Sequence, residues 1–284
     1  MGKLTHKWIK SASTKWEDAW VERLRGVGEE NLAIFSRPGS PVMRMEAFVT
    51  GAVGRSLVGQ FGGRVEVLSD PAMAPTRPSP PVAIRGRLRI FSDRESWKAA
   101  PQFMERNLLV PQGMAFGTGS HATTASCLRL LCDFVPRLTV GFTAADLGTG
   151  TGILAMGASA LGARSVLAID NDPHSIRTAK ANVRINGFKN IRVQRGEVDA
   201  WSPEKGAFDV ITANLFSELL IHIRTRVAPA LRPGGLLILS GILRNQWDEV
   251  ETAYRKVGMR AETVTRSGKW VAACLQSKVG SDKG

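Results

Sequence analysis

The sequence predicts a doubly wound α/β fold, with a seven-stranded, mostly parallel sheet and a small α+β domain in front of it. From about residue 109 onward, apolar strand-like runs alternate with helical patterns, which is typical of a parallel sheet covered on both faces. One of these runs leads into a glycine loop that opens a helix. The length of 284 residues exceeds that of a typical single domain, so a second, smaller domain is expected.

The composition is that of an ordinary globular protein, with 43% hydrophobic and 22% charged residues. It argues against a disordered or fibrous chain. No stretch approaches the roughly 18 uncharged apolar residues of a membrane-spanning helix, and the N-terminus lacks a signal-peptide pattern, so a cytoplasmic protein is expected. The three cysteines and four histidines are too scattered to predict a disulfide framework or a metal site.

The chain carries a net charge of +13, from 38 lysines and arginines against 25 aspartates and glutamates. Such an excess favours an anionic partner such as RNA or a ribonucleoprotein particle. The excess is spread along the chain, however, and its densest cluster, four lysines within residues 1–15, is expected to be a solvated end. Direct binding of nucleic acid is therefore left open.

Residues 1–70 are expected to form the small α+β domain. Trp16, Trp20 and Leu24 recur at helical spacing, which predicts an amphipathic helix over 14–25. The remaining elements expected here are strands over 32–35, 42–49 and 64–68 and a helix over 53–61. Of these, the last two strands and the helix between them form a β-α-β unit.

A proline-rich linker is predicted after the small domain. Five prolines lie between residues 71 and 81, and proline sustains neither a helix interior nor a central strand. Residues 71–108 are therefore interpreted as a linker that contains one short strand over 87–91 and a polar connecting helix over 94–107.

The large domain is expected to span residues 109–284. Its helix over 125–134 precedes seven predicted strands, over 143–147, 165–170, 191–194, 208–213, 236–240, 259–265 and 270–275. The last two strands are joined by the short hairpin connection Ser267-Gly268, which makes the final strand antiparallel.

A glycine loop follows the first of these strands. It contains Asp146, Gly148, Gly150 and Gly152, and its third glycine comes too early for the dinucleotide fingerprint. Asp146 is expected to face the amino group of an amino-acid ligand, and it would repel a pyrophosphate. Asp170, 22 residues after Gly148, ends the next strand and is positioned to accept hydrogen bonds from ribose hydroxyls. The pattern favours S-adenosylmethionine over NAD as cofactor, with an empty tight turn as the alternative.

A second glycine-punctuated loop, residues 116–120, leads into the helix that precedes the glycine loop. Paired hydroxyls at a helix start, Thr123 and Thr124, are either an N-cap or a seat for the carboxylate of the methionine moiety. Phe116 is expected to cover the cofactor. His121 is interpreted as a structural residue.

Asn214 follows the apolar run 210–213 and stands at the carboxyl end of the fourth strand, where an open α/β sheet places its ligand crevice. Its amide carbonyl is suited to orient an attacking amine without adding a charge. A strand-terminating turn residue is the alternative interpretation. Because a sulfonium is already activated, methyl transfer needs mostly alignment of the reactants, and Asn214 is the predicted catalytic residue.

These segments, in this order, make residues 109–275 resemble the bacterial PrmA-type ribosomal protein L11 methyltransferases, a family of class I S-adenosylmethionine-dependent enzymes with a Rossmann-like fold. The segments that carry the resemblance are Phe116-Gly-Thr-Gly-Ser-His-x-Thr-Thr, Asp146-x-Gly-x-Gly-x-Gly-Ile-Leu-Ala, Asp170-x-Asp-Pro, Ala213-Asn-Leu and Leu239-Ser-Gly-Ile-Leu. The resemblance implies cofactor contacts at four positions: Thr124, Gly148, Asp170 and Asn214.

The resemblance also implies a substrate, because the family methylates lysines of a large-subunit ribosomal protein and docks it through a ferredoxin-like N-terminal domain. Residues 1–70 match that domain only in their β-α-β portion, and Val110-Pro-Gln-Gly stands where the family has Asp-Pro-Gly. A monomer is expected. If residues 1–70 dock the substrate, removal of residues 1–105 leaves cofactor binding intact.

Two other function classes stay open. One is an N-methyltransferase for RNA, glutamine or a small molecule, although such enzymes typically have prolines after the residue equivalent to Asn214, where this chain has Leu215-Phe216. The other is a non-catalytic S-adenosylmethionine-binding protein, which the presence of Asp146, Asp170 and Asn214 disfavours.

Overall fold

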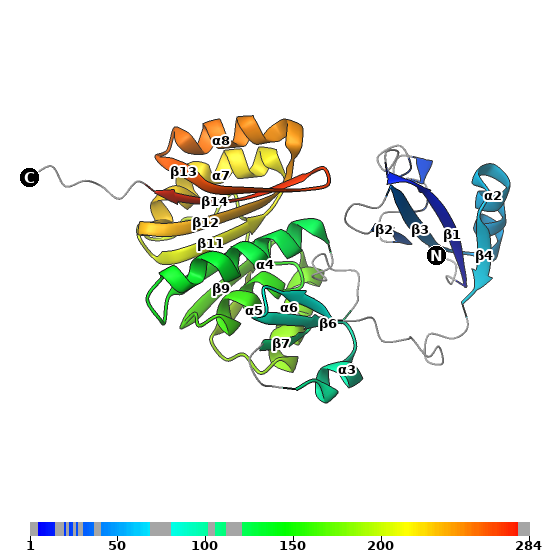
Figure 1. Cartoon of the computed structure of the whole chain (residues 1–284), viewed down its shortest axis with the longest axis horizontal. Helices are drawn as coiled ribbons and strands as arrows, with labels where there is room; N and C mark the ends of the chain where they lie inside the picture. Colours follow the sequence, from blue (N-terminus) through cyan, green and yellow to red (C-terminus); the bar gives the residue numbers. More distant parts are fainter. Residues whose placement is uncertain are drawn as a thin grey trace, which may run out of the picture. The chain divides into compact units, whose positions relative to one another are not determined.

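The computed structural model describes residues 5–14, 20, 23–24, 27, 31–36, 41–68, 81–101, 106–111 and 121–277. The chain divides into two compact units, Met1–Arg77 and Pro78–Gly284 (Figure 1). Within the described ranges no helix is both long and apolar enough to cross a membrane.

The first unit is a four-stranded sheet with strand order β2-β3-β1-β4. Its elements are β1 (His6–Ser13), β2 (Leu32–Ser36), β3 (Val42–Val49), α2 (Gly51–Phe61) and β4 (Arg64–Val67). Because β1 is antiparallel to both β3 and β4, those two strands run parallel to each other with β1 between them. The predicted β-α-β unit is therefore confirmed in its split form, which belongs to the ferredoxin-like arrangement.

The central strand β1 corrects one sequence expectation, since residues 6–13 are not a solvated chain end. Trp8 is fully buried in the core of this unit, and Lys7 forms ion pairs with Glu46 and Glu66 at 3.5 and 3.8 Å. These acids lie on the neighbouring strands, so nothing near the lysines in the sequence reveals them. Of the predicted helix over 14–25, Trp20 is helical and buried, whereas Trp16 lies outside the described residues.

Residues 82–109 hold more strand than expected and form a three-stranded sheet, β5-β6-β7, in the second unit. Its elements are β5 (Val82–Ile84), β6 (Leu88–Phe91), α3 (Arg94–Ala99) and β7 (Arg106–Leu109). The connecting helix expected to reach residue 107 ends at Ala99, because Pro101 follows and removes helical conformation from its predecessor. The prolines at 71–80 lie outside the described residues.

The large sheet of the second unit has seven strands in the order β10-β9-β8-β11-β12-β14-β13. They are β8 (Thr143–Leu147), β9 (Ser165–Asp170), β10 (Ile191–Arg195), β11 (Phe208–Asn214), β12 (Leu231–Leu243), β13 (Met259–Ser267) and β14 (Trp270–Ser277). Strands β8 to β12 pair in parallel, and β14 is antiparallel to both of its neighbours. The predicted fold and its closing hairpin are confirmed.

Helices cover both faces of this sheet (Figure 1). One face packs against α4 (Ala122–Phe134), α5 (Ile153–Ala160) and α6 (Pro173–Ile185), and the other against α7 (Ser217–Ala230) and α8 (Trp247–Arg255). Successive residues of β8 alternate between the two cores, as a strand buried on both faces requires. The carboxyl ends of β8, β9 and β11 thereby meet at the edge where such folds bind their ligands.

Candidate functional site

The glycine loop after β8 depends on backbone conformations that favour glycine. Gly148, Gly150 and Gly152 all have positive φ angles, of +70°, +53° and +82°. A Cβ atom at Gly148 would lie 2.4 Å from Cδ2 of Leu215, which comes from the loop after β11. The N–H groups of Gly148 and Thr149 both donate to the Ile169 carbonyl oxygen at 2.9 Å, so β9 holds the start of the loop.

Asp146 lies beneath this loop with 1% of its surface exposed. Its carboxylate accepts hydrogen bonds from Thr149 Oγ1 at 2.6 Å, from Thr212 Oγ1 at 2.7 Å and from the backbone N–H of Ala155 at 3.2 Å. Ala155 belongs to the first turn of α5, where the helix dipole favours a negative charge. The carboxylate therefore joins the loop, β11 and α5, whereas the sequence analysis expected it to face a ligand; that contact stays a prediction.

Burial raises the pKa of Asp146 to about 6, and the nearby charge of Asp170 acts in the same direction. The hydrogen bonds from Thr149, Thr212 and Ala155 act against burial, because they stabilise the ionised form. The group is thus poised to change its ionisation just below neutral pH.

Asp170 ends β9 and faces the other side of the glycine loop. One carboxylate oxygen accepts a hydrogen bond from the Gly150 N–H at 2.9 Å, and the other accepts one from the Asp172 N–H at 3.0 Å. A carboxylate oxygen has room for a further donor, so both oxygens retain capacity for hydroxyl groups. The two carboxylates together bracket the loop that the sequence analysis predicted to hold the cofactor.

Helix α4 begins three residues earlier than predicted, and neither threonine is its N-cap. His121 is the N-cap, and its ring nitrogen Nδ1 accepts a hydrogen bond from the Thr123 N–H at 3.4 Å. Thr124 is 1% exposed, and its Oγ1 is buried with no hydrogen-bond partner in the described part of the chain. A buried hydroxyl without a hydrogen-bond partner destabilises the fold unless a ligand supplies that partner. Thr124 is therefore suited to contact a cofactor.

Asn214 is joined to the same helix start. Its amide Nδ2 donates to Thr123 Oγ1 at 3.2 Å, and Thr123 Oγ1 lies 2.7 Å from His121 Nδ1. The carboxyl end of β11 and the start of α4 are thus brought together, as the prediction for Thr124 and Asn214 requires. Phe116 lies outside the described residues.

Sequence reasoning missed several residues that build this site. Thr149 and Thr212 hold the Asp146 carboxylate, Leu215 packs on Gly148, and His121 is a partner of Thr123 rather than an isolated structural residue. Thr149 lies three residues after Asp146, a spacing that suggests the bond; the contacts of Thr212 and Leu215 join distant parts of the sequence and carry no local signal.

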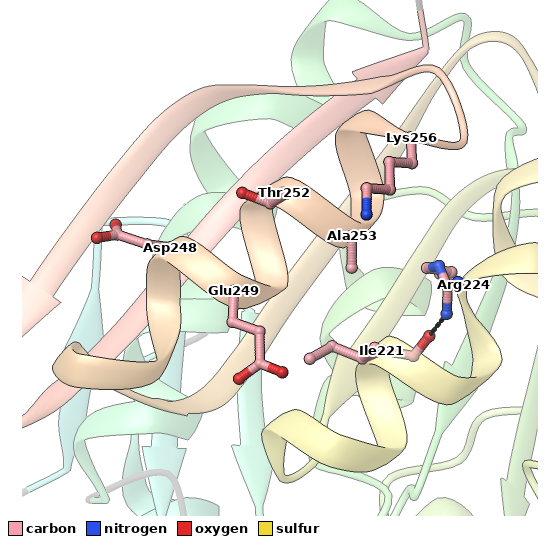
Figure 2. Close-up of a pocket in the computed structure, with 7 residues that line it drawn as sticks. All are labelled: Ile221, Arg224, Asp248, Glu249, Thr252, Ala253 and Lys256. Atoms are coloured by element: carbon pink, nitrogen blue, oxygen red, sulfur yellow. Dashed lines mark hydrogen bonds between the residues drawn. The ribbon is translucent and has the colours of Figure 1, made fainter.

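A separate groove lies between α7 and α8 (Figure 2). Its lining consists of Ile221, Arg224, Asp248, Glu249, Thr252, Ala253 and Lys256. The Arg224 side chain folds back so that Nη1 donates to the Ile221 carbonyl oxygen. None of these seven residues belongs to the glycine loop or the strand ends, so the groove is distinct from the predicted cofactor site.

Known proteins resemble the second unit. The family model for "Ribosomal protein L11 methyltransferase (PrmA)" matches residues 77–278. Proteins named "Ribosomal protein L11 methyltransferase" are 36% identical over 192 residues in Listeria innocua and 40% identical over 201 residues in Chloroflexus aurantiacus. These matches cover 68% and 62% of this chain, and the chain spans about 60% of the length of each relative.

A solved structure of a ribosomal protein L11 methylase is also similar to this chain. The ribosomal protein L11 methylase from Lactobacillus delbrueckii subsp. bulgaricus is 29% identical, with a TM-score of 0.61, and the match covers 70% of this chain and 100% of that one. The matched family segment, residues 77–278, coincides with the second unit and contains every described residue of the candidate site. The chain therefore belongs to the ribosomal protein L11 methyltransferase (PrmA) family.

Proposed function

We propose that this protein transfers methyl groups from S-adenosylmethionine to lysine amino groups of a ribosomal protein, in the cytoplasm. The cofactor choice rests on one observation: the chain's own carboxylates already accept from backbone N–H groups that a phosphate would use. The Gly150 N–H donates to Asp170, and the Ala155 N–H at the start of α5 donates to Asp146. A pyrophosphate would meet occupied donors and two negative charges, whereas a cationic ligand is attracted by them.

The residues that would hold the cofactor come from three segments. Thr124 offers a buried hydroxyl without a partner in the described ranges, which suits the carboxylate of the methionine moiety. Asp170 has capacity for the ribose hydroxyls, and Gly148 and Gly150 let the backbone approach closely. Phe116 is proposed, as in the sequence analysis, to cover the cofactor.

Asn214 is the proposed catalytic residue. When bound, S-adenosylmethionine supplies a methyl group whose bond to sulfur breaks with the electron pair staying on sulfur, while the lysine nitrogen forms the new bond and its proton leaves to water. A neutral amide that accepts a hydrogen bond from the amine orients the nitrogen lone pair without stabilising a protonated, unreactive ammonium as a carboxylate would.

The first unit is proposed to dock the protein substrate. Its split β-α-β sheet belongs to the ferredoxin-like arrangement, and Phe35 of β2 is 51% exposed, an apolar group free to contact another protein. The pairing of Phe35 with Arg44 across β2 and β3 places a cation beside it. Both features suit a surface that receives a folded protein.

Labelling tests the proposal. The protein is incubated with S-adenosylmethionine carrying a radioactive methyl group and with ribosomal protein L11, ribosomal RNA or a cell lysate in separate reactions. We expect label in L11, and acid hydrolysis is expected to recover it as methylated lysine. Label in RNA or on glutamine contradicts the substrate, and tight cofactor binding without label in any fraction contradicts the activity.

A further inference from the structure

The hydrogen-bond partners of Asn214 lead away from the cofactor loop and into the start of α4. Asn214 Nδ2, Thr123 Oγ1 and His121 Nδ1 follow one another at 3.2 and 2.7 Å. Thr123 is 2% exposed, so this connection is enclosed by protein. We call these three residues the positioning chain.

The direction of each bond in the positioning chain follows from the donors and acceptors present. The Thr123 N–H points at His121 Nδ1, so we assign this nitrogen as an acceptor, with the ring proton on Nε2. An imidazole nitrogen has one lone pair in the ring plane, so in this tautomer the Thr123 hydroxyl at 2.7 Å is its main donor, and the Thr123 N–H at 3.4 Å makes only a weak second contact. The hydroxyl oxygen is left to accept, and only the NH₂ end of the Asn214 amide donates to it.

With these roles, Asn214 Nδ2 is held at Thr123 Oγ1, and the amide oxygen Oδ1 is directed away from it. Resting on the proposed function, we propose that His121 and Thr123 are positioning residues that present Asn214 Oδ1 to the attacking amine. Without them the amide is free to turn by half a rotation and offer NH₂, a donor that repels the N–H of the amine.

The surroundings of His121 keep the ring in the form that this role needs. Burial, and after it the Lys269 ammonium, hold the pKa of His121 below its usual range. The Trp270 ring meets the imidazole edge to face at 5.8 Å, and both of these residues come from the β13–β14 hairpin. Protonation of Nδ1 would also remove the acceptor of both Thr123 contacts, so the hydrogen bonds of the positioning chain favour the unprotonated nitrogen.

Paired variants of Thr123 separate positioning from packing. Thr123→Val keeps the shape but deletes the hydroxyl, and we expect kcat for methylation of L11 to fall about 10-fold with the KM for S-adenosylmethionine changed less than about 3-fold. Thr123→Ser restores the hydroxyl and is expected to recover most of the lost kcat. Equal losses in both variants, or an unchanged kcat in Thr123→Val, would overturn the proposal.

Paired variants of His121 test the acceptor. We expect kcat of the wild type to fall at acidic pH, where protonation of His121 removes the acceptor of Thr123. His121→Asn places an amide oxygen near the Nδ1 position, so it is expected to keep the wild-type kcat at pH 8 and to lose that fall, because an amide does not titrate. His121→Phe fills the space without an acceptor and is expected to lower kcat as Thr123→Val does. A His121→Phe enzyme with the wild-type kcat and pH profile contradicts the role.

A readout without turnover keeps this proposal separate from the proposed function. Nitrogen-15 NMR of the four histidines, with His121 assigned through His121→Asn, is expected to show Nδ1 unprotonated at pH 7.5, and Thr123→Val is expected to raise the pKa of His121. A proton on Nδ1 refutes the positioning chain. If the NMR result holds but no lysine is methylated, the proposed function fails instead.

Discussion

Asp146 is a buried acid whose hydrogen bonds connect separate elements of the fold. Its three donors come from the glycine loop, β11 and α5, so one side chain joins three elements at the point where they meet. The cost is desolvation, which raises the pKa of the carboxyl to about 6. An acid with a raised pKa binds its proton more tightly in the folded chain than in the unfolded chain, so its ionisation opposes folding.

We expect the stability of the wild type, relative to Asp146→Asn, to fall as the pH rises from about 4 to about 6. The unfolded chain releases the proton first, near the ordinary value of 3.8, and the folded chain only near 6. The loss is roughly 2 to 3 kcal/mol, from about two pKa units at 1.36 kcal/mol each. Urea unfolding at a series of pH values measures it.

Asp172→Asn is the matched control, because hydrogen bonds from His174 and Ser175 lower the pKa of this exposed cap. The expected pH dependence has the opposite sign: the stability of the wild type relative to Asp172→Asn increases as the pH rises through the acidic range. If Asp146→Asn shows the same trend as Asp172→Asn, burial does not control the ionisation of Asp146.

Asp170→Ala is expected to weaken the binding of S-adenosylmethionine by about 1 to 3 kcal/mol. The loss comes from charge-assisted hydrogen bonds to the ribose and from the Gly150 contact. Titration calorimetry with the cofactor and with NAD measures this. Unchanged affinity in the variant, or tight NAD binding by the wild type, would sink the cofactor assignment.

Asn214→Ala is expected to lower kcat more than it lowers cofactor affinity, because the proposed partner of Oδ1 is the amine in the transition state. The loss is expected to be about 10-fold to 100-fold in kcat, with a change in cofactor Kd of less than about 3-fold. Steady-state kinetics and calorimetry on the same preparation supply both numbers. Parallel losses make Asn214 a binding residue only.

At the scale of elements, one side chain fastens the small sheet to α6. Asn186 follows the last residue of α6, and its amide bonds both backbone groups of Leu109 at the end of β7, accepting from the N–H at 2.7 Å and donating to the carbonyl at 2.8 Å. Leu109 is 1% exposed, so water cannot replace these bonds. The amide therefore acts as a substitute for a neighbouring strand.

Asn186→Leu is expected to lower the free energy of unfolding of the second unit by about 2 to 4 kcal/mol, because two buried backbone groups lose their partners. Chemical denaturation followed by circular dichroism measures the change. Asn171→Ala is the control, since within the described residues its exposed side-chain amide bonds the Glu197 carboxylate alone, and the free energy of unfolding is expected to stay within about 0.5 kcal/mol. Equal effects would mean that the Leu109 bonds contribute little.

The seven strands of the large sheet were predictable because each is a short apolar run bounded by turn residues, and β8 and β9 match their expected bounds in full. Strands β1, β5 and β7 were not predictable. Their stability comes from partners far along the chain: β1 is completed by strands at 42–49 and 64–67, and β7 by Asn186. Local patterns carry no record of such pairings.

The candidate site also combines features that local sequence patterns predict with contacts that they do not. The places of Gly148, Asp170 and Asn214 at strand ends and in the glycine loop were predictable from local sequence patterns, whereas their roles stay predictions. The bond from Asn214 to Thr123 joins residues 91 positions apart, and the orphan hydroxyl of Thr124 exists only once α4 is packed. Long-range contacts of this kind arise from the tertiary fold, which motif spacing does not describe.

At the scale of the whole molecule, the boundary between the units moves relative to the sequence expectation. Ile84, Leu88 and Ile90 of the small sheet are at most 3% exposed and belong to the core that contains α4 and α5. The chain from Pro78 onward thus belongs to the second unit and does not merely connect to it. We therefore expect that removal of residues 1–105 takes part of the core of the second unit with it, in contrast to the expectation from the sequence.

A chain of residues 78–284 is expected to fold cooperatively and to bind S-adenosylmethionine with a Kd within about 3-fold of the full protein, yet to lose methylation of intact L11. A chain of residues 106–284 is expected not to fold, since each lost aliphatic side chain costs about 2 to 5 kcal/mol against a total of about 5 to 15. Thermal denaturation and calorimetry test both. Full-rate methylation of L11 by the chain of residues 78–284 would contradict the docking role of residues 1–70.

The strand order also sets when each unit is able to form during biosynthesis. The sheet of the first unit is complete at Val67, whereas β14, which follows β12 and β13 along the chain, lies inside the large sheet between them. At about 5 to 20 residues per second, the exposed edge of β12 waits for seconds until residues 270–277 emerge. The first unit is able to fold while translation continues, but the large sheet of the second unit is completed only when β14 has been made. A nonsense mutation that removes β14 would leave that edge open to aggregation.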